Sequence, residues 1–305
     1  MTVVNDRELT RLGAEEDRGQ VRAGRSLVRS ATLRFSANKA AMMGLVVIAI
    51  LILATIFVPF VSPFTIEQVE YTSILQPPSL ESGHWFGTDD IGRDMFVRTF
   101  YAGRYSLAIG VLATGVALVI GVFYGTVAGY SGGRLGELMM RGVDVLYALP
   151  TLFFIMILMT VLGSKNILVV FMCIGALEWL TLARIIRGQT LSIKRKEYME
   201  AARAIGLPSR IILRRYILPN VVGPVVVYVT LLIPVNIMIE SYLSFLGLGV
   251  QEPLTSWGLL ISQGGNQIEN APWLLGFPAG LLIVTLLSFN FIGDGLRDAL
   301  DPKDR

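Results

Sequence analysis

The sequence of 305 residues has little charge and few metal-binding side chains. Only 16% of its residues are charged, 53% are hydrophobic, and the mean hydropathy is +0.61. An ordinary soluble domain carries about 25% charged residues. The single cysteine, Cys173, excludes an internal disulfide bond, and the single histidine, His84, excludes a metal site built from several histidines. These shortages exclude an ordinary soluble enzyme, and the high hydrophobicity excludes a disordered chain.

Long apolar runs are abundant instead, and they predict six membrane-spanning helices. A helix needs about 20 apolar residues to cross the hydrocarbon core, where it must satisfy its own backbone hydrogen bonds. The runs are 40–66, 105–133, 145–164, 166–183, 216–239 and 270–293. Pro150 and Pro234 lie in the third and fifth runs, where a missing N–H can bend a helix.

Basic residues predict the orientation of these spans. Residues 1–40, 131–142 and 184–215, with the tail from Arg297, hold 22 of the 26 Lys and Arg. Lys and Arg favour the cytoplasmic side, so both termini are expected to be cytoplasmic. The net charge of +3 then reflects orientation rather than a nucleic-acid partner.

The spans divide the chain into five expected segments. The N-terminal segment is a cytoplasmic tail with a short interfacial helix, predicted from Leu27, Ala31 and Phe35 at helical spacing. The expected segments are 1–40 (tail), 41–62 (first transmembrane helix), 63–102 (extracytoplasmic loop), 103–294 (five-helix domain) and 295–305 (cytoplasmic tail).

Within the spans, small residues stand out and charge is scarce. Gly121, Gly125 and Gly129 recur every four residues and predict a face that another helix can approach closely, although a glycine-rich chain can produce this spacing by chance. Glu178 and Glu240 are the two carboxylates within the predicted helices, each expected near a helix end. A transporter driven by an ion gradient usually keeps a charge near the midplane, so these two support that design weakly.

The longest inward segment, residues 184–220, predicts a rigid elbow. Residues 197–205 are rich in alanine and predict a short helix, and Gly206 suits the left-handed conformation that ends a helix. Pro208 fits the first turn of a second helix, and Pro219 is expected to reset the chain before the fifth span. A solvated basic loop is the alternative, but the glycine and proline punctuation argues against it.

Residues 200–219 resemble the E-A-A-x3-G-x9-I-x-L-P loop of ATP-binding-cassette importer permeases, with Tyr216 where the pattern has isoleucine. In that family the loop enters a cleft on an ATPase subunit and transmits its closure to the membrane helices. Two alanines would keep the surface low enough to enter the cleft. The resemblance implies that the ATPase contact is made by Glu200, Ala201, Ala202, Gly206 and Leu207.

Two outward segments narrow the resemblance to one group. Residues 87–94 are similar to the G-T-D-x-x-G-R-D segment of dipeptide, oligopeptide and nickel permeases, and residues 240–249 with 256–258 are similar to another segment of the same group. Both are typical of its C-type subunit. The resemblance implies an all-α membrane protein with the six-helix type I importer permease fold, in the bacterial inner membrane.

Local rules give further expectations for the outward segments. Residues 87–101 are expected to form a short helix in which Asp94 and Arg98 pair at i, i+4. Trp257 either helps a loop close the outer side or anchors at the membrane interface. The pathway is assigned, on weak grounds, to Glu240, Ser241, Ser244 and Phe245.

The resemblance also implies what works with this chain. The expected partners are a homologous B-type permease, two ATPase subunits that hold ATP and Mg²⁺, an extracytoplasmic substrate-binding protein and membrane lipid. This chain is then expected to have no catalytic residue, metal or cofactor of its own. Peptides are the expected cargo, while nickel complexes and oligosaccharides stay open, as do a stand-alone ion-coupled transporter and a structural scaffold.

Overall fold

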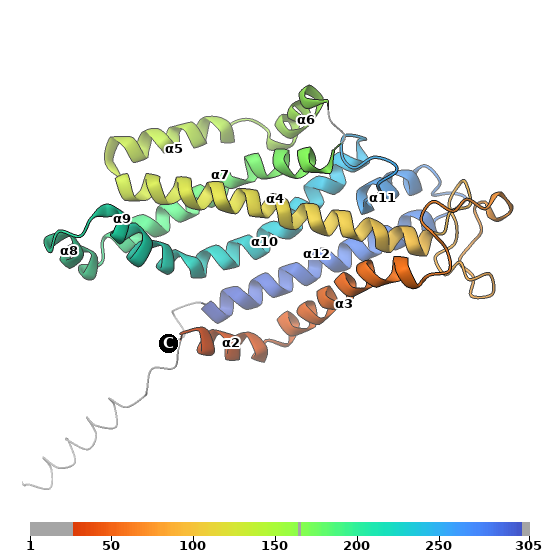
Figure 1. Cartoon of the computed structure of the whole chain (residues 1–305), viewed down its shortest axis with the longest axis horizontal. Coiled ribbons are helices and arrows are strands. Elements are labelled where there is room, and N and C mark those ends of the chain that lie inside the picture. Colours follow the sequence, from red (N-terminus) through yellow and green to blue (C-terminus); the bar gives the residue numbers. More distant parts are fainter. Residues whose placement is uncertain (1–26, 164–165, 301–305) are drawn as a thin grey trace, which may run out of the picture.

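In the computed structural model, which describes residues 27–163 and 166–300, the chain is built from helices joined by short loops (Figure 1). The elements are α2 (Leu27–Ala37), α3 (Lys39–Val61), η1 (Tyr71–Ser73), α4 (Met95–Ser131), α5 (Gly133–Tyr147), α6 (Thr151–Leu162), α7 (Ile167–Lys194), α8 (Glu197–Ala204), α9 (Ser209–Ile211), η2 (Ile212–Ile217), α10 (Leu218–Phe245), α11 (Trp257–Gly265) and α12 (Trp273–Leu300). The all-helical prediction is confirmed for these residues, as is a helix over 27–37. The expected tails before residue 27 and after residue 300 lie outside the described residues.

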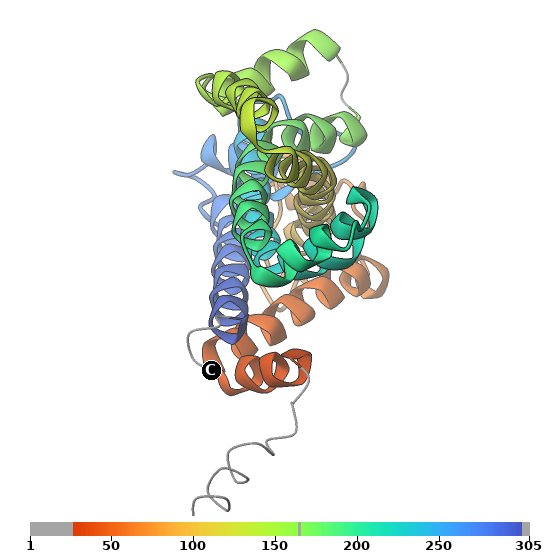
Figure 2. The same cartoon turned by 90° about the vertical axis from the view of Figure 1, so that its left-hand side faces the viewer.

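Within residues 27–163 and 166–300, five helices are long and apolar enough to cross a membrane: α3, α4, α7, the continuous α9–α10 segment, and α12. They run along the long axis of the molecule, with α5 and α6 on one side and α2 and α3 on the other (Figures 1 and 2). Helices α5 and α6 pass the same test only as a pair, and they are bent by 81° where they meet. The structure therefore supports five spans, or six if this bent pair is one.

The expected third span, 145–164, is wrong as a single helix. Helix α5 ends at Tyr147, and α6 begins only at Thr151, with Pro150 at its N-cap. Proline has no N–H to donate, so the helix breaks there. The 12 residues of α6 rise about 18 Å, well short of a hydrocarbon core of about 30 Å. Pro234, in contrast, lies inside α10 without interrupting it.

Several helices extend past the apolar runs that predicted them. Helix α4 begins at Met95 rather than 105, and α7 continues to Lys194 rather than 183. The first span ends earlier, at Val61. Pro219 does not reset the chain, because it occupies the first turn of α10, directly after the π-helical stretch η2. Hydropathy indicates which residues lie in the hydrocarbon core. A helix can continue beyond that core for as long as its backbone hydrogen bonds persist.

The glycines of α4 form a close seam with α7, which confirms the predicted small-residue face. A methyl group on Gly129 would lie 2.6 Å from Cβ of Thr190, and one on Gly121 would lie 2.9 Å from Cβ of Leu182. On the α7 side, a methyl group added to Gly175 would lie 2.6 Å from the Ala113 carbonyl oxygen. The seam lets the two backbones approach where lipid offers no hydrophobic driving force.

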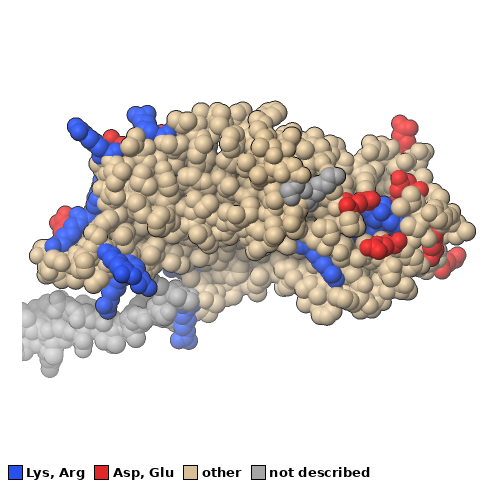
Figure 3. All heavy atoms as spheres, turned by 45° about the horizontal axis from the view of Figure 1, so that its top comes forward, with Lys and Arg blue, Asp and Glu red and all other residues tan. Residues whose placement is uncertain are grey.

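The two ends of the long helices differ in charge. They are called the α8 end and the α11 end, after the helix that lies at each. Figure 3 shows Lys and Arg gathered at the α8 end and most Asp and Glu at the opposite, α11 end. The α11 end also carries the loops 62–94 and 246–256. Its core holds buried Met95, Trp257 and Leu274, from three different helices.

Candidate functional site

The expected elbow is present between α7 and α10. Helix α8 ends in two hydrogen bonds typical of a glycine-terminated helix: Gly206 N donates to Arg203 O at 2.9 Å, and Leu207 N donates to Ala202 O at 3.1 Å. Gly206 has a φ of +77°, so its left-handed conformation is confirmed. Pro208 then leads into α9 as its N-cap residue, one position before the predicted first turn.

The elbow has its own small core, which makes it stiff. The buried side chains of this core are Ile193, Met199, Ile212, Ile217 and Val221. Tyr130, at the end of α4, donates its hydroxyl to Ser209 Oγ at 2.9 Å, and Lys194 Nζ donates to the Tyr130 carbonyl oxygen at 2.6 Å. Force applied to α8 therefore reaches α4, α7 and α10 through side chains that are already in contact.

The five expected contact residues are brought together at the tip of the elbow, but they do not all face outward. Glu200, Ala201 and Gly206 are exposed, and Leu207 is half-buried. Ala202 is only 4% exposed, unlike Ala201 beside it. This burial differs from the expectation that both alanines lie at the surface that enters the cleft, and the ATPase contact of Ala202 itself stays a prediction.

The four residues assigned to the pathway lie at the other end of α10. Glu240 and Ser244 are completely buried, and Ser241 is 7% exposed, whereas Phe245 is 48% exposed. Ser244 Oγ donates to Glu240 Oε1 at 2.6 Å, and Ser106 Oγ of α4 donates to Glu240 Oε2 at 3.0 Å. Glu240 therefore joins α10 to α4 inside this chain, and its role in a pathway stays a prediction.

Ser106 and Trp257 extend this buried network to α11. Trp257 N donates to Ser106 Oγ at 3.1 Å, and its Nε1 donates to the Thr99 carbonyl oxygen at 2.9 Å. Trp257 is completely buried, so the expectation of an interfacial anchor is wrong. Sequence reasoning did not select Ser106 as a site residue, because a serine 134 positions from Glu240 gives no local signal.

An ionic cluster ties the loop 246–256 to the start of α4. Arg93 bonds Asp89 at 2.6 Å and Glu252 at 3.0 Å. Burial alone would lower the pKa of Arg93, but its hydrogen bonds and attraction to both carboxylates raise it. Burial alone would likewise raise the pKa of Glu252, but the hydrogen bond and charge of Arg93, with the charge of Arg98, lower it. Arg98 lies 3.7 Å from Asp89 and 3.5 Å from Glu252.

The expected Asp94–Arg98 pair does not form. Asp94 instead caps α4, accepting from Val97 N at 2.8 Å, and it bonds the buried His84 ring at 2.8 Å. The separate short helix expected over 87–101 does not form. Residues 87–94 are a loop, and residues 95–101 are the first turns of α4. Within residues 27–163 and 166–300, no group of three or more His, Cys, Asp or Glu is arranged to hold a metal ion.

The chain is similar over most of its length to known proteins. Residues 117–305 match the family described as the inner membrane component of binding-protein-dependent transport systems. The chain belongs to this family. Residues 26–78 also match the N-terminal transmembrane domain of oligopeptide transport permease C. With its apolar helices, this makes the chain a multi-pass protein of the inner membrane.

Curated relatives cover nearly the whole chain. The oligopeptide transport system permease protein OppC of Escherichia coli (strain K12) is 52% identical over 92% of this chain and 93% of its own length. OppC of Bacillus subtilis (strain 168) is 45% identical over 92% and 91%. The dipeptide transport system permease protein DppC of the same strain is 43% identical over 92% and 87%. The resemblance to C-type permeases is thereby confirmed.

Proposed function

We propose that this chain is one permease subunit of an ATP-driven importer that carries oligopeptides or dipeptides. The observation that carries the proposal is the stiff elbow with Glu200 and Ala201 exposed at its tip. The family is dependent on a binding protein, and the named relatives are peptide permeases, which favours peptides over nickel complexes or oligosaccharides.

In this proposal the α8 end is cytoplasmic, together with both termini. The bent α5–α6 pair counts as one broken span, so the chain crosses the membrane six times. The gathering of Lys and Arg at the α8 end supports this orientation. The α11 end then faces outward and receives cargo from the binding protein.

The energy for transport comes from partner chains. Two ATPase subunits bind ATP and Mg²⁺ and hydrolyse the nucleotide, so this chain has no catalytic residue. An ATPase cleft holds α8, and closure of the ATPases moves it. Because α9, η2 and α10 form one continuous 37-residue segment, a displacement of α8 turns the whole of α10. Cargo passes between this chain and a homologous B-type permease.

The test is to measure ATPase attachment and transport with a charge reversal at the tip. Glu200→Lys is expected to reduce the amount of ATPase that co-purifies with the permeases by about tenfold. Substitution of an energetically dominant interface residue commonly weakens binding by this much or more. Peptide uptake into proteoliposomes loaded with ATP should fall in parallel. Glu137→Lys is the matched control, because Glu137 is also an exposed carboxylate at the α8 end but lies on α5.

Two results would reject the proposal. One is co-purification of the ATPases with Glu200→Lys at the level of the unaltered protein. The other is peptide uptake that continues without ATP and collapses when the ion gradient is removed, which would identify a stand-alone ion-coupled transporter.

A further inference from the structure

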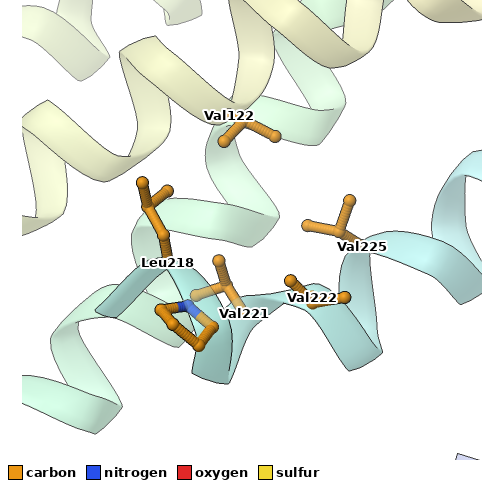
Figure 4. Close-up of a pocket in the computed structure, with 6 residues that line it drawn as sticks. Val122, Leu218, Val221, Val222 and Val225 are labelled. Carbon is orange, nitrogen blue, oxygen red and sulfur yellow. The ribbon is translucent and has the colours of Figure 1, made fainter. Parts of the chain in front are cut away.

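A groove between α4 and the start of α10 has apolar walls and a basic rim. It has a volume of about 680 Å³ and is lined on α4 by residues that include Val119, Val122 and Phe123. Arg210 and Arg214 line it from α9 and η2. A neighbouring hollow of about 410 Å³ shares Val122, which lies across from valines of α10 (Figure 4). A ligand that fits this groove needs an apolar body and a negative end.

The two arginines are available to such a ligand. They lie one helical turn apart, and both are exposed. Across the part of the chain that the structure describes, neither makes a hydrogen bond, an ion pair or a ring contact. Arginine side chains at this spacing can bind one phosphate together, through planar groups that donate several hydrogen bonds.

Thr126 is the one hydroxyl-bearing residue among those that line the groove. Its side chain lines the groove and is only 5% exposed, yet its Oγ1 has no hydrogen-bond partner in the described chain. Thr114, on the same helix, behaves as expected and donates to the Gly110 carbonyl oxygen at 2.7 Å. A buried hydroxyl without a partner costs free energy, and rotation of this hydroxyl toward a ligand acceptor in the groove would relieve that cost.

The length and direction of the groove fit one lipid leaflet. Its α4 wall runs from Leu118 to Val127, which is about 14 Å at the rise of an α-helix. Half of a hydrocarbon core is about 15 Å. Thr126 lies toward the basic end of this wall and Val119 toward the midplane. An ester oxygen just below a phosphate would therefore meet Thr126, with an acyl chain continuing past Val122.

We propose that this groove binds one anionic phospholipid of the cytoplasmic leaflet, with its phosphate at Arg210 and Arg214 and an acyl chain between α4 and α10. A helix of the second permease would cover the valines equally well, but two guanidinium groups at the rim favour a negative headgroup. The inference takes the cytoplasmic orientation of the α8 end from the proposed function, and it adds a ligand that the proposed function does not require.

The experiment titrates the complete, delipidated transporter with phosphatidylglycerol or phosphatidylcholine and counts bound lipid by native mass spectrometry. Phosphatidylglycerol should bind the unaltered transporter more tightly. A basic residue near an anionic lipid contributes about fivefold in affinity, so Arg210→Gln with Arg214→Gln should weaken binding about 30-fold. Arg215→Gln is the matched control, because Arg215 is exposed on η2 but does not line the groove. It should bind as the unaltered protein does.

Two further variants test the apolar and hydroxyl contacts separately. Val122→Trp should abolish binding by filling the groove while both arginines stay in place, and Thr126→Val should weaken it about threefold, because it removes one hydrogen bond. Equal binding by the double arginine variant, or equal affinity for the two lipids, would overturn the proposal. So would release of the second permease by Val122→Trp with lipid binding unchanged. None of these results depends on peptide uptake, so failure here is distinguishable from failure of the proposed function.

Discussion

At the α11 end the arginines contact partners within the chain, whereas at the α8 end several arginines are exposed. Arg93 bonds two carboxylates at the α11 end, and Arg104 donates to the Thr55 carbonyl oxygen at 2.6 Å. At the α8 end Arg195, Arg214 and Arg215 are exposed. The arginines of the first end are therefore held by contacts inside the chain, and those of the second are open to other molecules.

The buried polar groups follow the same division. Glu240, Ser106 and Trp257 connect three helices near the α11 end through hydrogen bonds that are all internal. The core of the elbow is apolar instead, with Met199 and Ile212 at its centre. A buried polar network fixes one arrangement of its helices, because each polar group requires its partner. The apolar core of the elbow makes no such demand, so the elbow can move as one stiff unit.

The largest expected effect comes from breaking the α11 end at its centre. Trp257→Ala removes a completely buried ring and its hydrogen bond to Thr99, and it should lower the free energy of unfolding by about 3–5 kcal/mol. Denaturant unfolding of the purified protein in detergent micelles measures this loss. Trp85→Ala is the control, because Trp85 is at the same end but 53% exposed. Similar losses for both would show that the internal network does not hold this end together.

The second effect concerns the α4–α7 seam, which connects the two ends. Gly125→Ala would bring a methyl group into the Ala183 carbonyl oxygen, so it should destabilise the protein by about 1–3 kcal/mol. Gly115 lies in the same helix with nothing within 4 Å of an added methyl group. Gly115→Ala should therefore be neutral or stabilising by up to about 1 kcal/mol. Thermal unfolding in one detergent separates the two, and equal midpoints would disprove the seam.

These two sites also show what sequence alone predicts. The seam was predictable, because a spacing of four places glycines on one helix face whatever they contact. The elbow was predictable for the same local reason, since Gly206 and Pro208 determine backbone conformation where they stand. The ends of α4 and α7 were not predictable from hydropathy, because Arg98 and Arg104 in α4, and Arg184 and Arg187 in α7, end an uncharged run without ending the helix.

Long-range contacts overruled local rules at the α11 end. Asp94 and Arg98 have the spacing of a helical ion pair, but capping of α4 and the His84 ring occupy the carboxylate. Trp257 has the side chain of an interfacial anchor, but Ser106 and Thr99 hold it inside. The N-cap of α4 is a local pattern, but no pattern within a few residues reveals His84, Ser106 or Thr99 as a partner.

The third effect compares two glycines in equivalent conformations at opposite ends. Gly206 and Gly247 have φ of +77° and +76°, and an added methyl group on either would meet nothing within 4 Å. Alanine at either position should therefore cost about 1 kcal/mol of local backbone strain. Only Gly206→Ala should reduce the peptide-stimulated ATP hydrolysis of the reconstituted transporter, because only Gly206 lies in the elbow. Equal loss of stimulation in both variants would contradict an elbow-specific role.

The smallest effect is the pH dependence of the Arg93–Glu252 contact. The pKa of Glu252 is lowered from its ordinary value of 4.5 in the folded protein. The contact therefore contributes stability that is fully present above pH 4.5 and is lost as pH falls through the lower, folded pKa. Because the Glu252 side chain is 50% exposed, the contribution should be less than about 1 kcal/mol.

Glu252→Gln tests this contribution directly, against Glu269→Gln as an exposed control at the same end. The difference in unfolding midpoint between the unaltered protein and Glu252→Gln should be constant from pH 8 down to about 5 and then shrink as the carboxyl group takes up a proton. Glu269→Gln should follow the unaltered protein throughout. A difference that grows on acidification would require a raised pKa and would show that Glu252 is not held by Arg93.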